Sequence, residues 1–382
     1  MDFALSDEQR MLRDNIVRFA REELSPGVIE RDREQVFPRE LWKRCGEIGI
    51  QGLPVPDEYG GSALDPLSCA IALEALGRGC ADGGLVFSLC AHLLACVVPL
   101  WKHGNDAMKS RYLRGLCDGS LVGCHAITEP GSGSDTFSMR TRAERVEGGW
   151  KLDGVKTFIS NGPVADVAVV FAMTDAAKGF HGGLTGFLLD RSMPGFSAGQ
   201  KFEKMGLRTS PVGELVFQEL FVPDDAVLGK VGGGAAVFGT AMEWERVLLV
   251  AAHVGAMARL LDTSVQYART RQQFGQPIGK FQAVSHKIAD MKVQLEAARL
   301  LAYQSAWKLG RSRDIALDAA ITKLFVSESL VKASLDAVQL HGGYGFMTEY
   351  EVERALRDAV GSTIYSGTSE MQRNMIARWI GL

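Results

Sequence analysis

The spacing of apolar residues changes twice along the chain, and this change constrains the fold more than any other feature. Residues 1–118 place apolar side chains at helical intervals, beginning after a capping pattern at Ser6 and Gln9. Residues 119–230 contain short runs rich in β-branched and aromatic residues, separated by Gly, Pro and Asp. Residues 231–382 return to long helical stretches. This order predicts an α+β protein with an N-terminal helical domain, a middle antiparallel β domain and a C-terminal four-helix bundle.

Charge and cysteine usage argue against several functional classes. The 382-residue chain carries a formal net charge of −3, which gives no reason to expect a nucleic acid or an anionic membrane as partner. Its seven cysteines form no C-x-x-C pair and no Cys/His ligand spacing, so we expect reduced thiols and no metal. The N-terminus MDFALSDEQR is acidic and mixed, unlike a signal peptide, and we expect a cytoplasmic protein.

One apolar stretch approaches the length of a membrane span. It covers residues 84–101, GLVFSLCAHLLACVVPLW. Ser88, His92 and Pro99 interrupt it, and no basic flank anchors it. We therefore expect a buried helix in a helical core and no membrane association.

Five short motifs carry the functional signal. They are AITEPGSGSD (126–135), KTFISNG (156–162), YARTRQQFGQPIG (267–279), QLHGGYGF (339–346) and IYSGTSEMQR (364–373). In this order and spacing they resemble the acyl-CoA dehydrogenase family, flavoproteins that oxidise acyl thioesters between the α and β carbons. The resemblance implies FAD as cofactor, a homotetramer, and an electron-transferring flavoprotein or oxygen as electron acceptor. Its fold, a helical domain, a β domain and a four-helix bundle, agrees with the order predicted from spacing.

The first two motifs are expected at the flavin. By the resemblance, Ile127 and Thr128 contact the flavin ring, and Ser134 bonds a phosphate or the thioester arm of the substrate. Phe158 would lie where the family usually places a tryptophan, and Ser160 would replace a threonine donor. An ordinary strand end and a core phenylalanine are the structural alternatives for these two motifs.

The later motifs are expected at a second part of the cofactor. By the resemblance, Arg271, Gln273 and Phe274 reach the pyrophosphate and adenosine of FAD in a neighbouring subunit, where an arginine fork suits phosphate oxygens. A solvated helix end would explain the same charged run. The remaining cofactor contacts implied by the resemblance, with a bare backbone expected at the two glycines, are Gln339, Gly342, Gly343, Thr368 and Glu370.

Ser366 raises a chemical difficulty, because members of the family often have a glutamate at this place. Removing an α-proton from a thioester needs a group that accepts protons near neutral pH, and a serine hydroxyl does not. A buried carboxylate does, since loss of solvation raises its pKa.

Glu245 is the alternative base. Members of the family that act on branched acyl groups carry the base on a bundle helix directly before an arginine, and here Arg246 follows Glu245. Glu243 lies about 200° around the same helix, so both carboxylates cannot face one ligand. An ion pair with Arg246, or a helix cap, would be a purely structural role for Glu245. We expect Glu245 to be the catalytic base, and Arg246 to orient the substrate or the loop that carries Ser366.

Tyr365 and Ser366 are expected beside the acyl group. A short side chain at Ser366 leaves room for a branched, cyclic or amino-substituted group. Four further stretches point to a sub-group; they are GCADGGLVFSLCAHLLACVVP (79–99), MEWER (242–246), AVSHKIADMK (283–292) and YSGTS (365–369). They resemble members of the family that oxidise prolyl groups on a carrier protein in natural-product pathways. A branched short-chain acyl-CoA dehydrogenase that passes electrons to an electron-transferring flavoprotein is the alternative enzyme. A flavin oxygenase of the same fold and a non-catalytic flavin-binding scaffold are further alternatives.

Overall fold

The computed structural model describes residues 4–312 and 314–382. Its N-terminal region is helical, as the apolar spacing predicts, and α1 begins at the predicted capping box. Ser6 Oγ accepts a hydrogen bond from the Gln9 amide, and the Gln9 side chain accepts one from the Ser6 amide. The helices are α1 (Asp7–Phe19), α2 (Val28–Glu34), α3 (Arg39–Glu47), α4 (Pro66–Gly79), α5 (Gly83–His92), α6 (Val98–His103) and α7 (Asp106–Cys117), with π-helical turns at Ala20–Leu24 and Leu93–Val97.

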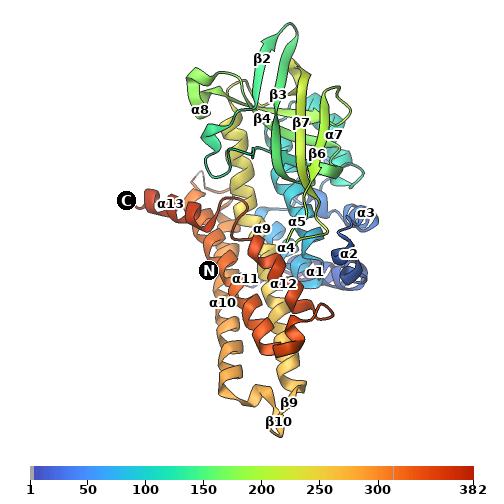
Figure 1. Ribbon diagram of the computed structural model, residues 1–382, viewed down its shortest axis with the longest axis vertical. Coiled ribbons are helices and arrows are strands. Elements are labelled where there is room, and N and C mark those ends of the chain that lie inside the picture. The colour runs from blue at the N-terminus through green and yellow to red at the C-terminus, as the bar shows by residue number, and fades with distance from the viewer. Residues whose placement is uncertain (1–3, 313) are drawn as a thin grey trace.

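The middle region forms a sheet that lies at one end of the molecule (Figure 1). Its strand order is β6–β7–β3–β2–β4–β5–β8, and β1 pairs beside β4. The strands are β1 (Gly123–Ala126), β2 (Arg142–Val146), β3 (Gly149–Ser160), β4 (Val167–Met173), β5 (Leu184–Asp190), β6 (Phe196–Lys201), β7 (Val212–Pro223) and β8 (Val227–Leu228), and a short helix α8 (Gly179–Gly183) precedes β5.

The expectation of an antiparallel domain needs one correction. Most neighbours are antiparallel, but β1 runs parallel to β4, and the single pairing of β2 with β4 is also parallel. The β2–β3 hairpin lies between β1 and β4 in the sequence, and a connection of that length can bring the chain back in the same direction.

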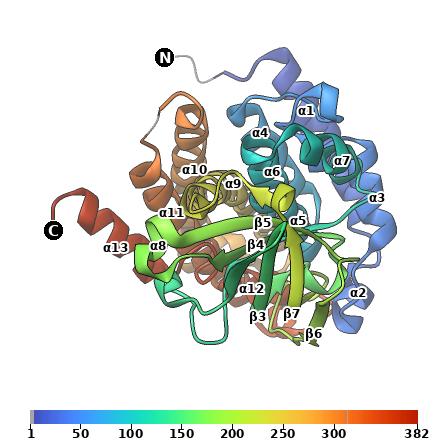
Figure 2. The ribbon, with the colours of Figure 1, turned by 90° about the horizontal axis from the view of Figure 1, so that it is seen from above.

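The C-terminal region contains three long helices, α9 (Gly234–Thr270), α10 (Gln282–Lys308) and α11 (Ala316–His341). A two-stranded hairpin, β9 (Gln272–Gln273) and β10 (Gln276–Pro277), joins α9 to α10 at the end farthest from the sheet (Figure 1). The shorter helices α12 (Glu351–Gly361) and α13 (Ser369–Trp379) pack on α11, and α13 projects from the body of the molecule (Figure 2). The predicted succession of helical, β and helical regions is confirmed.

Helix α9 connects all three regions. It packs against α4 of the N-terminal region, against β5 of the sheet, and against α10 and α11. Its contact with the sheet includes the ring of Phe238, which stacks on His125 of β1 with 6.0 Å between ring centroids. A side chain on α9 can therefore meet groups from the sheet and from the C-terminal loops at one place.

Among the described residues, two helical segments have the length and hydropathy of membrane spans, Gly83–His103 and Gly234–Thr270. The first contains the apolar stretch noted in the sequence. Within their most apolar windows, 89% and 72% of the residues are buried inside the protein. Core helices also have this burial, so the two segments are weak evidence for a membrane span.

Candidate active site

Glu245 lies in the interior of α9, and its side chain is only 8% exposed. Burial raises the pKa of its carboxyl, while the side chain of Ser366 and the charges of Arg246 and Lys323 oppose that rise. No ion pair joins Glu245 to any residue that the structure describes. The geometry therefore supports neither the pair with Arg246 nor the helix cap, and leaves a buried carboxylate that can accept a proton.

The loop after α12 is held beside this carboxylate from three directions. Arg246 Nε donates to the carbonyl of Ser366 at 2.9 Å, which is the loop-orienting one of its two expected roles. Lys323 Nζ of α11 donates to the carbonyl of Gly367 at 2.8 Å. The side-chain amide of Gln372 donates to both carbonyls, at 3.2 and 2.9 Å. These bonds fix the backbone that carries Ser366.

Ser366 itself has two unusual features. Its φ of 56° lies in the left-handed region, which non-glycine residues seldom adopt. Its Oγ is buried near the Glu245 carboxyl and lowers the pKa of that group, against the larger effect of burial. A non-glycine backbone held in this conformation fits a loop built around a ligand.

The residues expected at the flavin lie on neighbouring segments. Ile127 and Thr128 follow β1, and Thr128 O accepts a hydrogen bond from the amide of Thr157 at 2.9 Å. Phe158 comes next on β3, at a φ of 56° within an irregularity of the pairing with β7. Its ring is 64% exposed and lies 5.1 Å from the ring of Phe202. Phe158 is thus not a core residue, which removes that alternative.

A buried ion pair, which the sequence analysis missed, supports this segment. Lys156 Nζ lies 2.8 Å from Glu129 Oε1 and donates to the carbonyl of Ile127 at 3.1 Å. Glu129 also accepts hydrogen bonds from the amides of Arg140 and Thr141, at 2.6 and 2.9 Å. Burial lowers the pKa of Lys156 to about 8. Glu129 lies in the motif AITEPGSGSD and Lys156 in the motif KTFISNG. Their place in these two motifs was the sequence signal that could have indicated the pair.

The hydroxyls of the flavin segment fit a polar ligand. Ser134 is exposed, and a Cβ added to Gly131 or Gly133 beside it would meet no atom within 4 Å. The hydroxyls of Thr128, Ser134 and Ser160 bond no side chain or backbone group in the described parts of the chain. Together with the exposed ring of Phe158, they offer donors and an aromatic face to a planar cofactor with phosphates.

The later cofactor residues gather elsewhere. Arg271, Gln273, Gly342 and Gly343 line one pocket of about 560 Å³. Along α9 this pocket lies about 39 Å from Glu245, at the usual rise per residue. Arg271 lies over the ring of Tyr344, 5.3 Å from its centroid. These residues therefore cannot serve the cofactor that meets Glu245 of the same chain.

The other members of the later group vary in their surroundings. Phe274, in the β9–β10 turn, is 93% exposed. Thr368 caps α13 by accepting a hydrogen bond from the Met371 amide at 3.3 Å, while Glu370 and Gln339 are exposed. A Cβ at Gly343 would meet open space, so the chain itself does not require the bare backbone expected there. Gly342 has a φ of 59°, which residues with a Cβ rarely adopt, so a glycine is required at that position.

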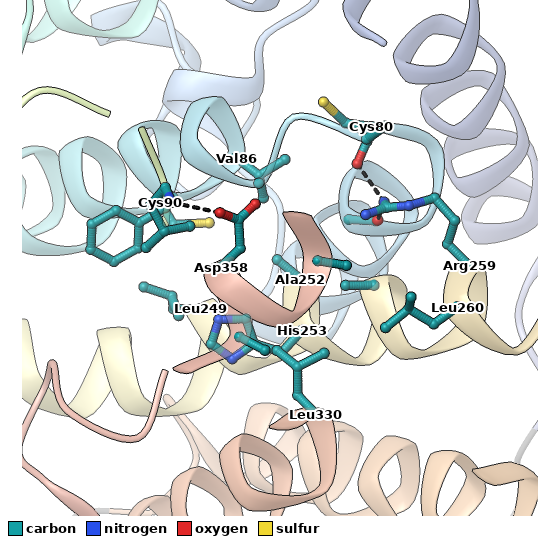
Figure 3. Close-up of a pocket in the computed structure, with 18 of the residues that line it drawn as sticks. Cys80, Val86, Cys90, Leu249, Ala252, His253, Arg259, Leu260, Leu330 and Asp358 are labelled. Atoms are coloured by element: carbon teal, nitrogen blue, oxygen red, sulfur yellow. Dashed lines mark hydrogen bonds between the residues drawn. The ribbon is translucent and has the colours of Figure 1, made fainter. Parts of the chain in front are cut away.

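Figure 3 shows a small pocket of about 60 Å³. It lies near Glu245, whose charge acts on two of its lining residues. Tyr365 and Cys90 line it, and the charge of Glu245 raises the pKa of both groups in addition to the larger effect of burial. The pocket also contains His253 and Asp358, which the sequence analysis missed. A lone histidine in the apolar run VLLVAAHVGAMARLL was a signal for the first, whereas nothing local marked the second.

Comparison with known proteins assigns the family. The acyl-CoA dehydrogenase N-terminal domain matches residues 6–120, the middle domain matches 124–220, and the C-terminal domain matches 232–381. The chain belongs to the acyl-CoA dehydrogenase family, as its motifs indicated.

Individual proteins and solved structures are similar to this chain over nearly its whole length. An L-prolyl-[peptidyl-carrier protein] dehydrogenase of Serratia sp. is 42% identical, over 100% of this chain and 99% of its own. A mitochondrial isovaleryl-CoA dehydrogenase of Oryza sativa is 40% identical, over 97% of this chain and 91% of its own. Among solved structures, PigA with FAD and proline has a TM-score of 0.97 at 42% identity, covering 100% of both chains. The prolyl acyl carrier protein oxidase AnaB has a TM-score of 0.96 at 42% identity, covering 99% of this chain and 100% of that one.

Proposed function

We propose that this protein catalyses FAD-dependent α,β-dehydrogenation of an acyl thioester, with a prolyl-like or branched acyl group on a carrier protein. The observation that carries the proposal is the buried, unpaired carboxylate of Glu245 beside a clamped loop that has a serine at position 366. Relatives that are 42% identical over the whole chain support the prolyl group and the carrier.

The cofactor would be held by this chain's flavin segment. Ile127, Thr128 and Ser160 would meet the ring system, with Phe158 against one face, and Ser134 would bond a phosphate or the thioester arm. Bound FAD supplies the acceptor for the hydride that leaves the β-carbon. The buried Lys156–Glu129 pair keeps the backbone beneath these contacts in place.

The chain's own chemistry is proton removal. Glu245 accepts the α-proton, and its raised pKa makes it a stronger base than an exposed glutamate. Arg246 and Lys323 keep the loop at a fixed distance from the carboxylate by bonding its carbonyls. The surrounding apolar side chains of α5 and α9 exclude water from the reacting carbon.

The test is a panel of thioesters mixed anaerobically with the purified holoprotein and followed by flavin absorbance. Prolyl and branched groups on a carrier protein should bleach the flavin faster than butyryl-CoA or octanoyl-CoA. If a straight-chain acyl-CoA is clearly fastest, the carrier assignment is wrong.

A branched short-chain acyl-CoA dehydrogenase is the second candidate, favoured by the 40% identity to isovaleryl-CoA dehydrogenase. The same panel separates the two, because isovaleryl-CoA would then outpace isovaleryl on a carrier. Adding oxygen or an electron-transferring flavoprotein to the reduced protein identifies which of them accepts the electrons.

We further propose a homo-oligomer, most simply a tetramer, in the cytoplasm. The distance between Glu245 and the pocket at Arg271 supports an assembly, because a second copy would bring that pocket to its neighbour's cofactor. Large apolar side chains exposed on the C-terminal helices also fit a subunit contact; they are Val293, Leu300, Leu335, Trp379 and Ile380. We expect the purified protein to be yellow from bound FAD, and light scattering to give a mass larger than that of a monomer. A colourless, folded monomer would contradict both the bound FAD and the homo-oligomer.

A further inference from the structure

The pocket beside Glu245 is apolar except for four side chains. Its walls come from α5, α9, α11 and α12 and include Val86, Leu249 and Leu330 (Figure 3). On α9, Glu245, Leu249 and His253 recur every four residues and so share one face. The pocket therefore continues from the base along the helix, where the acyl group of a thioester would extend.

Its size suits a small ring. A water molecule needs about 10–15 Å³ of such volume. The pocket of about 60 Å³ thus has room for roughly four to six water-sized groups, a range that includes the five ring atoms of a five-membered ring.

Two of the four polar side chains already have partners. Asp358 accepts a hydrogen bond from the Leu207 amide at 2.5 Å. Arg259 bonds Glu351 and the carbonyls of Gly77 and Cys80. The remaining two, His253 and Tyr365, bond one another, with 2.8 Å between His253 Nε2 and the Tyr365 hydroxyl.

The pair of His253 and Tyr365 leaves one ring nitrogen of the histidine without a hydrogen bond. His253 Nδ1 is buried without a partner among the described residues. Burial lowers the pKa of His253 to about 3, so the ring is neutral and has one N–H. A proton on Nδ1 would be a buried N–H donor without an acceptor. Leaving a buried N–H unpaired costs more free energy than leaving a buried acceptor atom unpaired. With the proton on Nε2, His253 donates to Tyr365, and the tyrosine keeps its own proton for another acceptor.

We propose that Tyr365, oriented by His253, donates a hydrogen bond to the ring nitrogen, in its neutral amine form, of a small saturated N-heterocyclic acyl group and so selects it over the carbocycle of equal size. The proposal rests on the proposed function and deepens it. Phe87 supports the geometry, because its ring packs on Tyr365 with 4.6 Å between centroids. A ring without nitrogen leaves the Tyr365 hydroxyl without an acceptor, because His253 Nε2 is the donor in their mutual bond.

The test compares prolyl and cyclopentanecarbonyl groups on the same carrier protein, by anaerobic flavin reduction at limiting thioester. The wild-type protein should prefer prolyl by roughly 5- to 150-fold, the range for leaving one buried donor unpaired. Tyr365→Phe keeps the ring against Phe87 and removes the hydroxyl, so the preference should fall at least fivefold. Equal rates for the two thioesters in the wild type would overturn the proposal.

His253 is a positioning residue. Its variants are therefore assayed by the same quantity, the ratio of the flavin-reduction rates with the prolyl and cyclopentanecarbonyl thioesters. His253→Leu should lower the preference for prolyl as Tyr365→Phe does, whereas His253→Gln, which can still bond the hydroxyl, should retain part of it. Flavin absorbance and circular dichroism check that each variant is folded and loaded, and either variant alone decides the question. An unchanged ratio in a folded variant refutes the inference while leaving the proposed function intact. If prolyl on the carrier never reduces the wild-type flavin, the proposed function itself has failed.

Discussion

Replacing Glu245 by glutamine should abolish most of the proton transfer while leaving the fold unchanged. Glutamine keeps the volume of the side chain and removes the proton acceptor. General-base catalysis contributes roughly 10²–10⁴-fold, which corresponds to about 3–5 kcal/mol of activation free energy. Because Glu245 forms no ion pair with Arg246, the bond from Arg246 to the Ser366 carbonyl should survive the change. The melting temperature should therefore stay level or rise slightly, since a buried charge is removed.

The assay is anaerobic flavin reduction by the best thioester, followed by stopped flow across a range of pH. In the wild type the rate should fall on the acid side as Glu245 is protonated, at a pH above the ordinary glutamate value because burial raises its pKa. Glu245→Gln should lose this acid limb along with the rate. Glu243→Gln is the matched control, because burial also raises the pKa of Glu243 but its side chain lies on another face of α9. Wild-type rates in Glu245→Gln, or an equal loss in Glu243→Gln, would refute the assignment of the base.

Three further outcomes are expected. Adding Ser366→Glu to Glu245→Gln should restore part of the reduction, most with a slim straight-chain thioester, and failure with every thioester would mean that the loop does not face the α-carbon. Lys156→Met leaves the Glu129 carboxylate buried and unpaired, so denaturant unfolding should show a loss of about 3–5 kcal/mol, partly regained when Glu129→Gln is added. Asp358 has its pKa raised from 3.8 to about 7 by burial, so its contribution to stability is complete below about 3.8 and is lost as the pH rises towards 7. Asp358→Asn should therefore stabilise the protein more at pH 8 than at pH 5, by up to ~3 kcal/mol, and a pH-independent effect would contradict the shift.

Local features of the sequence determined the order of the regions and much of the catalytic hypothesis. The spacing of apolar residues in helices and strands depends on residues only a few places apart. The capping box at Ser6 and the change in apolar spacing could therefore be predicted from the sequence alone. Choosing Glu245 needed only the chemistry of a serine at position 366, the resemblance to a family, and a carboxylate before Arg246. The structure adds burial and the lack of an ion pair to that choice.

Tertiary packing decided what those local features could not express. His253 and Tyr365 are 112 residues apart, and their hydrogen bond depends on how α9 meets the loop after α12. The resemblance assigned Arg271 to the cofactor of a neighbouring subunit, and the length of α9 sets how far this residue lies from Glu245, at the far end of the bundle. The parallel pairing of β1 with β4 likewise follows from the path of the intervening hairpin. Each of these depends on contacts between distant segments, whose geometry comes from the packing of the whole chain and not from any local pattern.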